Sequence, residues 1–289
     1  MNLSDYISFH SSPKLRDPIL LAAFAGWNDA AQAATSALLT LCRAWPAERF
    51  ADIHAEEFFV FSETRPTISL DATGMRSVHW PANRFFSYRQ ETAERDILLL
   101  IGTEPQLRWK SFCRAIVEVA GTVNASTLVT LGGLLADIPH TVEPRLQGFA
   151  SSEGHVEELK KLNMSLSSYQ GPTGIVGALH DAWQQTGKPA FSLWGSVPHY
   201  ISASPNPQVT LALLEKVSAL LDMDIPLGTL ERDAKAFRSQ VDEALLENPE
   251  ALEYVRTLEE QYNFDPPPTP SEDLLTELEE FLKGRRPPD

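Results

Sequence analysis

Four short apolar segments recur along the chain, and each ends at a glycine. The segments are PILLAAFAG (18–26), DILLLIG (96–102), STLVTLGG (126–133) and PAFSLWG (189–195). Segments that are apolar throughout are typical of strands buried on both faces, as in a parallel sheet covered by helices. Patterns at helical spacing follow at 28–42, 104–120 and 207–221. The sequence therefore predicts an α/β fold, a three-layer sandwich around a mostly parallel central sheet.

The region between the first two of these segments has a different pattern. Residues 50–60 and 66–89 hold shorter apolar stretches, broken by Pro66 and Pro81. We expect them to form an antiparallel extension or edge of the sheet. Large aromatic residues crowd this region, namely Trp45, Phe58, Phe59, Trp80, Phe85 and Phe86. If they are exposed, as an edge would leave them, aromatic side chains in that number favour a homo-oligomer over a monomer.

The C-terminal part of the chain is acidic and helical in pattern. The sequence predicts a core domain at 1–225 and a helical appendage at 226–289. From Thr229 onward there are 16 acidic and 7 basic side chains, so this part holds −9 of the net charge of −15. DPPPTP (265–270) predicts an extended linker. A last amphipathic helix at 271–283 is then expected to dock on the α/β domain of the same or a neighbouring subunit.

The charge balance and the apolar runs exclude two classes of partner. The chain has 39 acidic and 24 basic side chains and no basic stripe, which argues against nucleic acid because phosphate binding rests on clustered Lys and Arg. The longest apolar run, 19–27, is far shorter than the roughly 20 residues of a membrane-spanning helix. MNLSDYISFH at the N-terminus has no apolar signal region. We therefore expect a cytoplasmic protein that does not bind membranes.

The short motifs of common catalytic and cofactor sites are absent from the sequence. Neither G-x-G-x-x-G nor G-x-x-x-x-G-K-[ST] occurs, which disfavours nucleotide binding by a standard loop, and the G-x-S-x-G elbow of hydrolases is missing too. Cys42 and Cys113 lack CxxC spacing, and no histidines have H-x-x-x-H or H-E-x-x-H spacing. No metal, cofactor or catalytic residue is therefore assigned.

One edge of the predicted sheet is the natural place for a ligand. The carboxyl ends of parallel strands converge there, and α/β proteins usually bind ligands at that edge. Gly26 and Gly102 are expected at strand ends, where glycine lets the chain turn or another segment approach closely. Thr103, Glu104 and Pro105 are predicted to open the helix that follows the second strand.

The stretch FAGWNDAAQ (24–32) poses the choice between a binding site and a tight corner. Trp27, Asn28 and Asp29 follow Gly26 directly and stand at the expected start of the first helix. A carboxylate there can cap free amides and favours the helix dipole, but it would repel a phosphate. Helix capping and a ligand or interface role for Asn28 and Asp29 both remain open.

Two further stretches offer candidate residues. His140 and His199 each follow a proline just after a strand end, so they could form a metal or proton-transfer pair, or be hydrogen-bonded structural histidines. In YQGPTGIVGALHDA, Gly171 and Gly174 flank Thr173 at the start of a predicted helix. The exposed amides of that turn could hold an anion, whereas the alternative is close packing of a glycine-bearing helix on the sheet.

Four stretches in chain order resemble the successive motifs of one family. They are AFAGWNDAAQAAT, LLLIGTEPQLRWKSFCRAI, YQGPTGIVGALHDA and SLWGSVPHYISASPNPQVTLALLEKV. Over about residues 1–225 the chain is similar to the bacterial branch of the proteasome assembly chaperone 2 family. The resemblance implies a fold similar to the nucleoside phosphorylase-like fold and self-association. Members in archaea and eukaryotes are proteasome assembly or binding factors, whereas the bacterial branch has no agreed activity and offers no catalytic role to carry over.

The sequence departs from the family pattern in two places. Where the branch tends to show Pro-His-Thr-Arg-Pro, the chain has Pro139-His140-Thr141-Val142-Glu143-Pro144 and so lacks an arginine. The chaperones that dock on the proteasome cylinder end in hydrophobic–Tyr–any residue, whereas this sequence ends in Pro287-Pro288-Asp289. Proteasome docking by that route is therefore doubtful.

Two functions from different classes follow. The first is a non-enzymatic, chaperone-like protein-interaction protein that forms a homo-oligomer, a trimer being favoured over a dimer. The alternative is an enzyme or sensor for a nucleoside or phosphate compound that uses the strand-end edge. The candidate residues of a cleft or interface are Gly26, Trp27, Asn28, Asp29, Gly102, Glu104, His140, Gly171, Thr173, Gly174 and His199.

Overall fold

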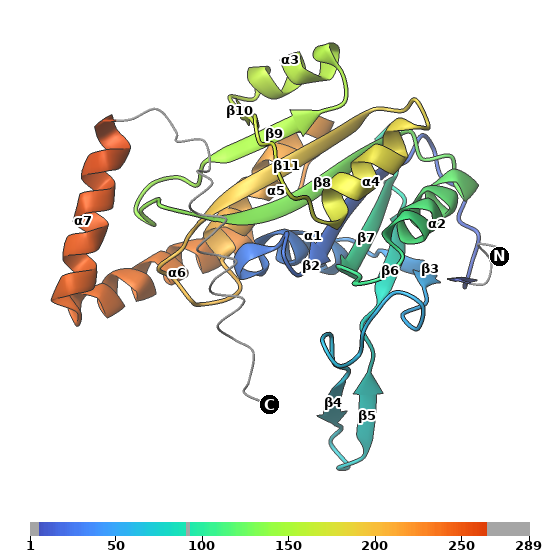
Figure 1. Ribbon diagram of the computed structural model, residues 1–289, viewed down its shortest axis with the longest axis horizontal. Coiled ribbons are helices and arrows are strands. Elements are labelled where there is room, and N and C mark those ends of the chain that lie inside the picture. The colour runs from blue at the N-terminus through green and yellow to red at the C-terminus, as the bar shows by residue number, and fades with distance from the viewer. Residues whose placement is uncertain (1–5, 91–92, 265–289) are drawn as a thin grey trace.

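A nine-stranded mixed sheet runs through the computed structural model, which describes residues 6–90 and 93–264 (Figure 1). Its strands are β1 (Ile7–Phe9), β2 (Ile19–Ala25), β3 (Glu48–Ile53), β6 (Asn83–Tyr88), β7 (Ile97–Thr103), β8 (Thr127–Ala136), β9 (Leu146–Ala150), β10 (Ser165–Leu166) and β11 (Ala190–Pro198). Their order is β1-β3-β6-β7-β2-β8-β11-β9-β10. The central strands β7, β2, β8 and β11 are parallel, as the apolar segments predicted.

Helices cover both faces of this sheet and make the predicted three layers (Figure 1). The helices are α1 (Ala33–Ala44), α2 (Trp109–Thr122), α3 (Glu153–Lys161), α4 (Ile175–Gln184), α5 (Pro207–Leu221), α6 (Gly228–Leu246) and α7 (Pro249–Phe264), with a short 3₁₀ helix η2 (Ala30–Gln32) before α1. Helices α2 and α4 pack on one face, whereas α1 and α5 pack on the other.

The two helical layers explain why the central strands are apolar throughout. In β2, Phe24 packs into the core under α2 and α4, whereas Leu21 packs into the core under α1 and α5. Both side chains are completely buried. Burying a side chain of this size contributes about 1.5–3 kcal/mol, so each strand supports two cores at once.

The edge of the sheet is antiparallel as predicted, but its aromatic residues are mostly not exposed. Strands β1, β3 and β6 pair antiparallel with their neighbours. Trp45, Phe58, Phe59 and Phe85 are buried and Phe86 is partly buried, which leaves Trp80, at 52%, as the exposed member of the predicted set. Their rings pack inward, because helices and loops cover this edge too; Phe58, for example, meets Phe112 of α2 edge-on. Exposure of these aromatic residues therefore gives no general argument for self-association.

Several helices begin later than the sequence patterns predicted. Ala31 and Gln32 adopt left-handed conformations (φ 46° and 52°), so α1 starts only at Ala33. Arg108 is also left-handed (φ 55°), so α2 starts at Trp109 and Glu104 does not open it. Helix α4 starts after Gly174, which leaves the preceding proline outside the helix. Left-handed backbone turns delay α1 and α2, and the turn at Arg108 leaves Glu104 available for another role.

Two parts extend from the sandwich in Figure 1. Strands β4 (Thr67–Leu70) and β5 (Arg76–His79) form a separate two-stranded sheet, and α7 stands beside the β8–β9 loop. Within the described ranges no helix is long and apolar enough to cross a membrane. The predicted linker at 265–270 and the helix at 271–283 lie outside the described residues, and the division at residue 225 stays a prediction.

Candidate functional site

The turn after β2 requires a glycine, and the polar side chains that follow it point into the protein. Gly26 has φ +127°, a region that L side chains rarely adopt, and a Cβ there would lie 3.2 Å from the Cβ of Glu104. Trp27 is 39% exposed, but Asn28 and Asp29 are buried. The polar groups of this turn therefore face the protein interior, where each must find a partner.

Glu104, just beyond the end of β7, accepts hydrogen bonds from most of these polar groups. Its Oε1 accepts hydrogen bonds from Nδ2 of Asn28 (2.9 Å) and from the backbone N–H of Ile175 (2.7 Å). Its Oε2 accepts from the backbone N–H of Trp27 (3.3 Å). We call Gly26, Trp27, Asn28, Glu104 and Ile175 the Glu104 hub, since one carboxylate joins the ends of β2 and β7 to the start of α4.

The hub also caps α4 from a distance of 71 residues in sequence. The N-cap residue of α4 is Gly174, which has no side chain of its own to accept a hydrogen bond. A carboxylate at a helix N-terminus both satisfies a free amide and complements the helix dipole. A Cβ on Gly174 would lie 2.4 Å from the side-chain amide of Asn28, so the glycine is needed for this approach.

Asn83, at the start of β6, supports the same strand end and was not among the predicted residues. Its Oδ1 accepts from the backbone N–H of Thr103 (3.0 Å), next to Glu104. Gly102 fits against it, because a Cβ there would lie 1.9 Å from that Oδ1. Asn83 follows Pro81-Ala82 where the edge strand begins, but this local pattern gives no sign of a contact with β7.

Asp29 turns away from the hub and caps α1. Its Oδ1 accepts from the backbone N–H of Ala34 (2.7 Å), and the hydroxyl of Thr35 donates to Oδ2. Burial raises the pKa of Asp29 above its ordinary value, although the hydrogen bonds from Thr35 and Ala34 act in the opposite direction. Of the two roles left open by the sequence, the structure thus contains the cap; a role in ligand binding stays a prediction.

Gly171 and Thr173 lie in the exposed loop before α4. The Thr173 hydroxyl is near the carbonyl of Gly174 (3.4 Å), and the Tyr169 hydroxyl donates to the carbonyl of Pro172 (2.9 Å). These contacts stay within the loop, so the loop amides are arranged around local turns. The predicted anion-binding turn at Gly171–Gly174 thus lies at the N-terminus of α4, which the Glu104 carboxylate already caps.

His140 and His199 meet around a common tyrosine. The Tyr200 hydroxyl lies 2.7 Å from Nδ1 of His140 and also accepts from its backbone N–H (2.7 Å). The ring of His199 packs edge-on against that of Tyr200, with centroids 5.8 Å apart. Burial raises the pKa of Tyr200 to about 12. The two predicted histidines therefore belong to one cluster, although no direct contact joins them.

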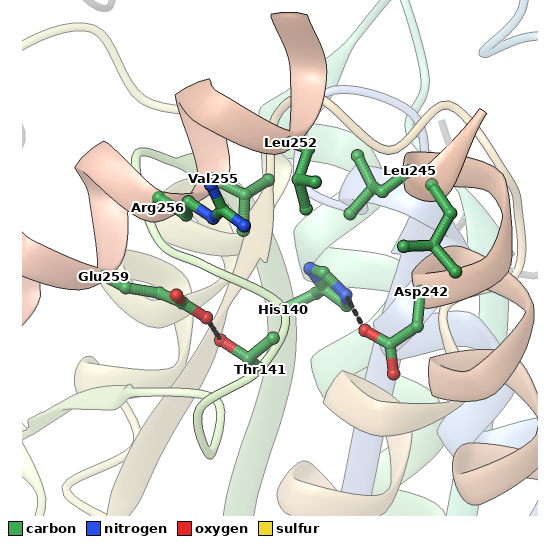
Figure 2. Close-up of a pocket in the computed structure, with 9 residues that line it drawn as sticks. His140, Thr141, Asp242, Leu245, Leu252, Val255, Arg256 and Glu259 are labelled. Atoms are coloured by element: carbon green, nitrogen blue, oxygen red, sulfur yellow. Dashed lines mark hydrogen bonds and ion pairs between the residues drawn. The ribbon is translucent and has the colours of Figure 1, made fainter. Parts of the chain in front are cut away.

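Helices α6 and α7 lie beside His140, as Figure 2 shows, and Tyr254 of α7 contacts both His199 and Tyr200. His140 is 2% exposed, and its Nε2 lies 3.0 Å from Oδ1 of Asp242 in α6. The Thr141 hydroxyl donates to Glu259 of α7, and the guanidinium of Arg145 lies 3.8 Å from the ring centre of Tyr262. These are structural contacts between the core and the C-terminal helices.

The hollow beside His140 is small and partly apolar. Its volume is about 210 Å³, below the roughly 300–1,000 Å³ of small-molecule sites. Leu252 and Val255 of α7 line it together with the His140–Asp242 pair (Figure 2). Within the described ranges no group of three or more His, Cys, Asp or Glu residues is placed to hold a metal ion.

Comparison with known proteins identifies the family. The family model described as the PAC2 family matches residues 23–245. A PAC2 family protein from Streptomyces avermitilis is 42% identical, with a TM-score of 0.74, over 83% of this chain and 100% of its own. A proteasome-assembly chaperone homologue from Mycobacterium tuberculosis is 38% identical, with a TM-score of 0.74, over 82% and 99%. A protein of unknown function from Corynebacterium glutamicum is 26% identical, with a TM-score of 0.80, over 89% and 97%.

No curated protein matches the chain. The family match spans the strand-end turn at Gly26, the Glu104 hub and the histidine cluster, and therefore includes every candidate residue of the site. This chain belongs to the PAC2 family.

Proposed function

We propose that this protein is a non-enzymatic protein-interaction protein of the proteasome-assembly-chaperone type, which works in the cytoplasm as a homo-oligomer, a trimer in preference to a dimer. The observation that carries the proposal is that the chain's own Glu104 occupies the helix terminus at which a ligand would be expected. The names of two relatives, a PAC2 family protein and a proteasome-assembly chaperone homologue, agree with it.

Anions bind at strand-end edges mainly through the free amides at helix N-termini. Three such termini are occupied by side chains of this protein. Glu104 accepts from the first amide of α4, Asp29 from amides of α1, and Asn206 from amides of α5 at 3.1 Å. Two of these side chains are carboxyl groups, so a phosphate would meet repulsion where it needs donors. A phosphate would therefore bind poorly at the helix terminus that suits it best. This disfavours the alternative function, an enzyme or sensor for a nucleoside or phosphate compound.

The Glu104 hub then has a structural purpose that fits an interaction protein. It fixes the turn at Gly26, and with it the exposed Trp27, relative to α4. A rigid surface loses little conformational entropy when a partner binds, which favours affinity. Trp27 remains a candidate interface residue on this surface.

Calorimetry with inorganic phosphate and a nucleoside monophosphate tests the closed site. We expect no binding by the wild-type protein at millimolar ligand. Glu104→Gln removes the charge, so phosphate affinity should rise at least several-fold, whereas Glu56→Gln, an exposed charge-matched control, should leave it unchanged. Micromolar binding by the wild type that Glu104→Gln abolishes would support the enzyme or sensor alternative instead.

Affinity purification from the native host, followed by mass spectrometry, tests the interaction itself. We expect the tagged chain to retain specific protein partners through washing, with proteasome components as the class that a relative's name suggests. A Trp27→Ala variant should lose part of the bound material if the strand-end surface is the contact. Recovery of the chain alone, in both forms, would contradict the proposal.

A further inference from the structure

The two-stranded sheet formed by β4 and β5 projects from the sandwich as an arm (Figure 1). We call residues 67–79 the β4–β5 arm. Its strands pair with one another and form a sheet separate from the nine-stranded one. At its base, Trp80 meets Phe61 edge-on, with ring centroids 4.8 Å apart. The arm is therefore attached to the molecule at one end and directed away from it.

The strand register divides the arm into an apolar and a polar face. Ile68 lies opposite Val78, and Leu70 lies opposite Arg76. Directly paired residues share a face, and residues two apart in a strand share it too. The apolar side chains are thus together, while Thr67, Ser69, Ser77 and His79 form the opposite face. This alternation is typical of a sheet that packs on another surface through one side.

The apolar face is largely open to solvent in the single chain. Ile68 is 61% exposed, Leu70 64% and Val78 52%, and Met75 at the turn is 67% exposed. Together with Trp80 these side chains expose on the order of several hundred Å² of apolar surface, at the upper end for a monomeric protein. A two-stranded hairpin is itself only marginally stable in water and gains stability by packing. Such a surface needs a partner.

The charge distribution makes the arm the surface on which a second copy of the chain can pack with least repulsion. The whole chain has a net charge of −15, so two copies repel one another over most of their surfaces. Residues 61–82, which contain the arm, hold two acidic side chains, Glu63 and Asp71, and two basic ones, Arg65 and Arg76. The arm is therefore a neutral region of an acidic protein. Arg76 stands on the apolar face and can meet an acidic group of the other copy.

We propose that the β4–β5 arm packs its apolar face on a second copy of this chain and is the contact through which the protein self-associates. The inference rests on the proposed function, of which the homo-oligomer is one part, and it names the surface that makes the oligomer. Of the predicted aromatic set it uses only Trp80, because the arm supplies the apolar area that the buried Phe85 does not.

Two doubly substituted variants test the arm by light scattering after size exclusion. Ile68→Lys/Val78→Lys places two charges on the apolar face, and Thr67→Lys/Ser77→Lys places the same two on the polar face of the same strands. We expect the wild type and the polar-face variant to share one oligomeric mass, and the apolar-face variant to fall to the mass of one chain, 32.1 kDa. Circular dichroism should show all three folded, since the apolar-face pair lies outside both cores.

The outcomes test the arm contact separately from self-association and from the proposed interaction function. An oligomeric mass in all three proteins, or equal dissociation of both variants, would overturn the arm contact but leave a homo-oligomer in place. A wild type of 32.1 kDa would remove self-association altogether, and the partner experiment would then test the interaction function alone.

Hydrogen exchange at residues 67–79 adds a second measurement. Cover by another copy predicts protection that falls when the protein is diluted to its monomer. Protection that is independent of concentration would instead indicate cover by a segment of the same chain, and exchange at the rate of a free hairpin would indicate no cover. Either of these results would contradict the proposal.

Discussion

The Glu104 hub satisfies its polar groups within the chain, whereas the β4–β5 arm leaves its apolar side chains exposed to solvent. In the hub, the donors of Asn28, Trp27 and Ile175 all end on one carboxylate of the same chain. In the arm, three apolar side chains on one face remain more than half exposed. A buried polar group left without a partner costs about 1–3 kcal/mol, and the hub avoids this cost because its donors share the Glu104 carboxylate. The apolar face of the arm, by contrast, stays in contact with solvent in the single chain. Self-association is therefore expected at the arm, whereas no anion is expected to bind at the helix terminus that Glu104 caps.

The largest expected effect on folding comes from the strand end behind the hub. In Gly102→Ala the new Cβ would lie 1.9 Å from Oδ1 of the buried Asn83, whose bond to Thr103 prevents an easy shift. Overpacking of this kind costs about 1–3 kcal/mol, and we expect the upper end. Urea unfolding monitored by fluorescence measures it.

Gly121→Ala is the matched control for this substitution. Gly121 lies in α2, and a Cβ added there would meet nothing within 4 Å, so alanine should be neutral or stabilise the helix by up to about 1 kcal/mol. Equal stability of the two variants would mean that Gly102 does not limit the approach of β6 to β7, and the hub would lose its structural support.

Removal of the hub carboxylate should cost slightly less. Glu104→Ala leaves Nδ2 of Asn28 and the N–H of Ile175 without their acceptor, and both residues are buried. We expect a loss of about 2 kcal/mol in the free energy of unfolding and faster amide exchange at Ile175. Glu104→Gln, which keeps one acceptor oxygen, should recover about half. If Glu104→Ala unfolds at the wild-type urea concentration, the groups are satisfied by water and the site is open to ligands.

The Asp29 cap should give the next smaller effect. Asp29→Ala removes the acceptor for Ala34 and Thr35, and the loss of a helix cap costs about 0.5–2 kcal/mol. Asp29→Asn keeps a carbonyl oxygen and should lose less. An unchanged thermal midpoint for Asp29→Ala would remove the capping role and strengthen the case for a functional carboxylate.

The Asp29 cap also predicts a pH dependence with a definite sign. Burial raises the folded-state pKa of Asp29 above its ordinary value. The stability linked to this shift is fully present below the unfolded pKa of about 3.9 and is lost as the pH rises through the folded pKa. The advantage of the wild type over Asp29→Asn should therefore shrink as the pH rises through that window. Urea unfolding at a series of pH values measures it, and a growing advantage would contradict the assigned environment.

The sequence predicted the layers and the strand ends better than it predicted the partners at those ends. Continuous apolar runs and helical spacing are local signals, so the parallel centre and α5, at residues 207–221, followed directly. Glu104 was expected to open its own helix, but it caps α4 instead. A partner 71 residues away leaves no local pattern. The left-handed Arg108, which separates Glu104 from α2, has no sequence signature either.

The aromatic residues and the histidines illustrate the same limit. Phe58 and Phe85 were expected at an exposed edge, yet both are completely buried, because nothing in their spacing indicates which loops and helices will cover them. His140 and His199 follow equivalent strand ends, so a shared edge was predictable. Their common contact with Tyr200 was not, since it depends on how the chain turns after β11.

The smallest expected effect on folding comes from the arm itself. Replacing residues 67–79 by a short Gly-Ser linker should change the unfolding free energy of the monomer by no more than about 0.5 kcal/mol, the usual limit for changes away from the core. None of the residues of β4 and β5 is buried, and the two strands pair only with each other in the described structure, so no core contact is lost. The chain ends to be joined are already close, because Thr67 lies opposite His79, so loop closure adds little cost. Chemical unfolding at a concentration where the protein is monomeric measures the effect, with Gly102→Ala as the positive control. A loss above about 2 kcal/mol, which is the size of a core defect, would make the arm part of the folded core, and its exposed face would then no longer distinguish it from the hub.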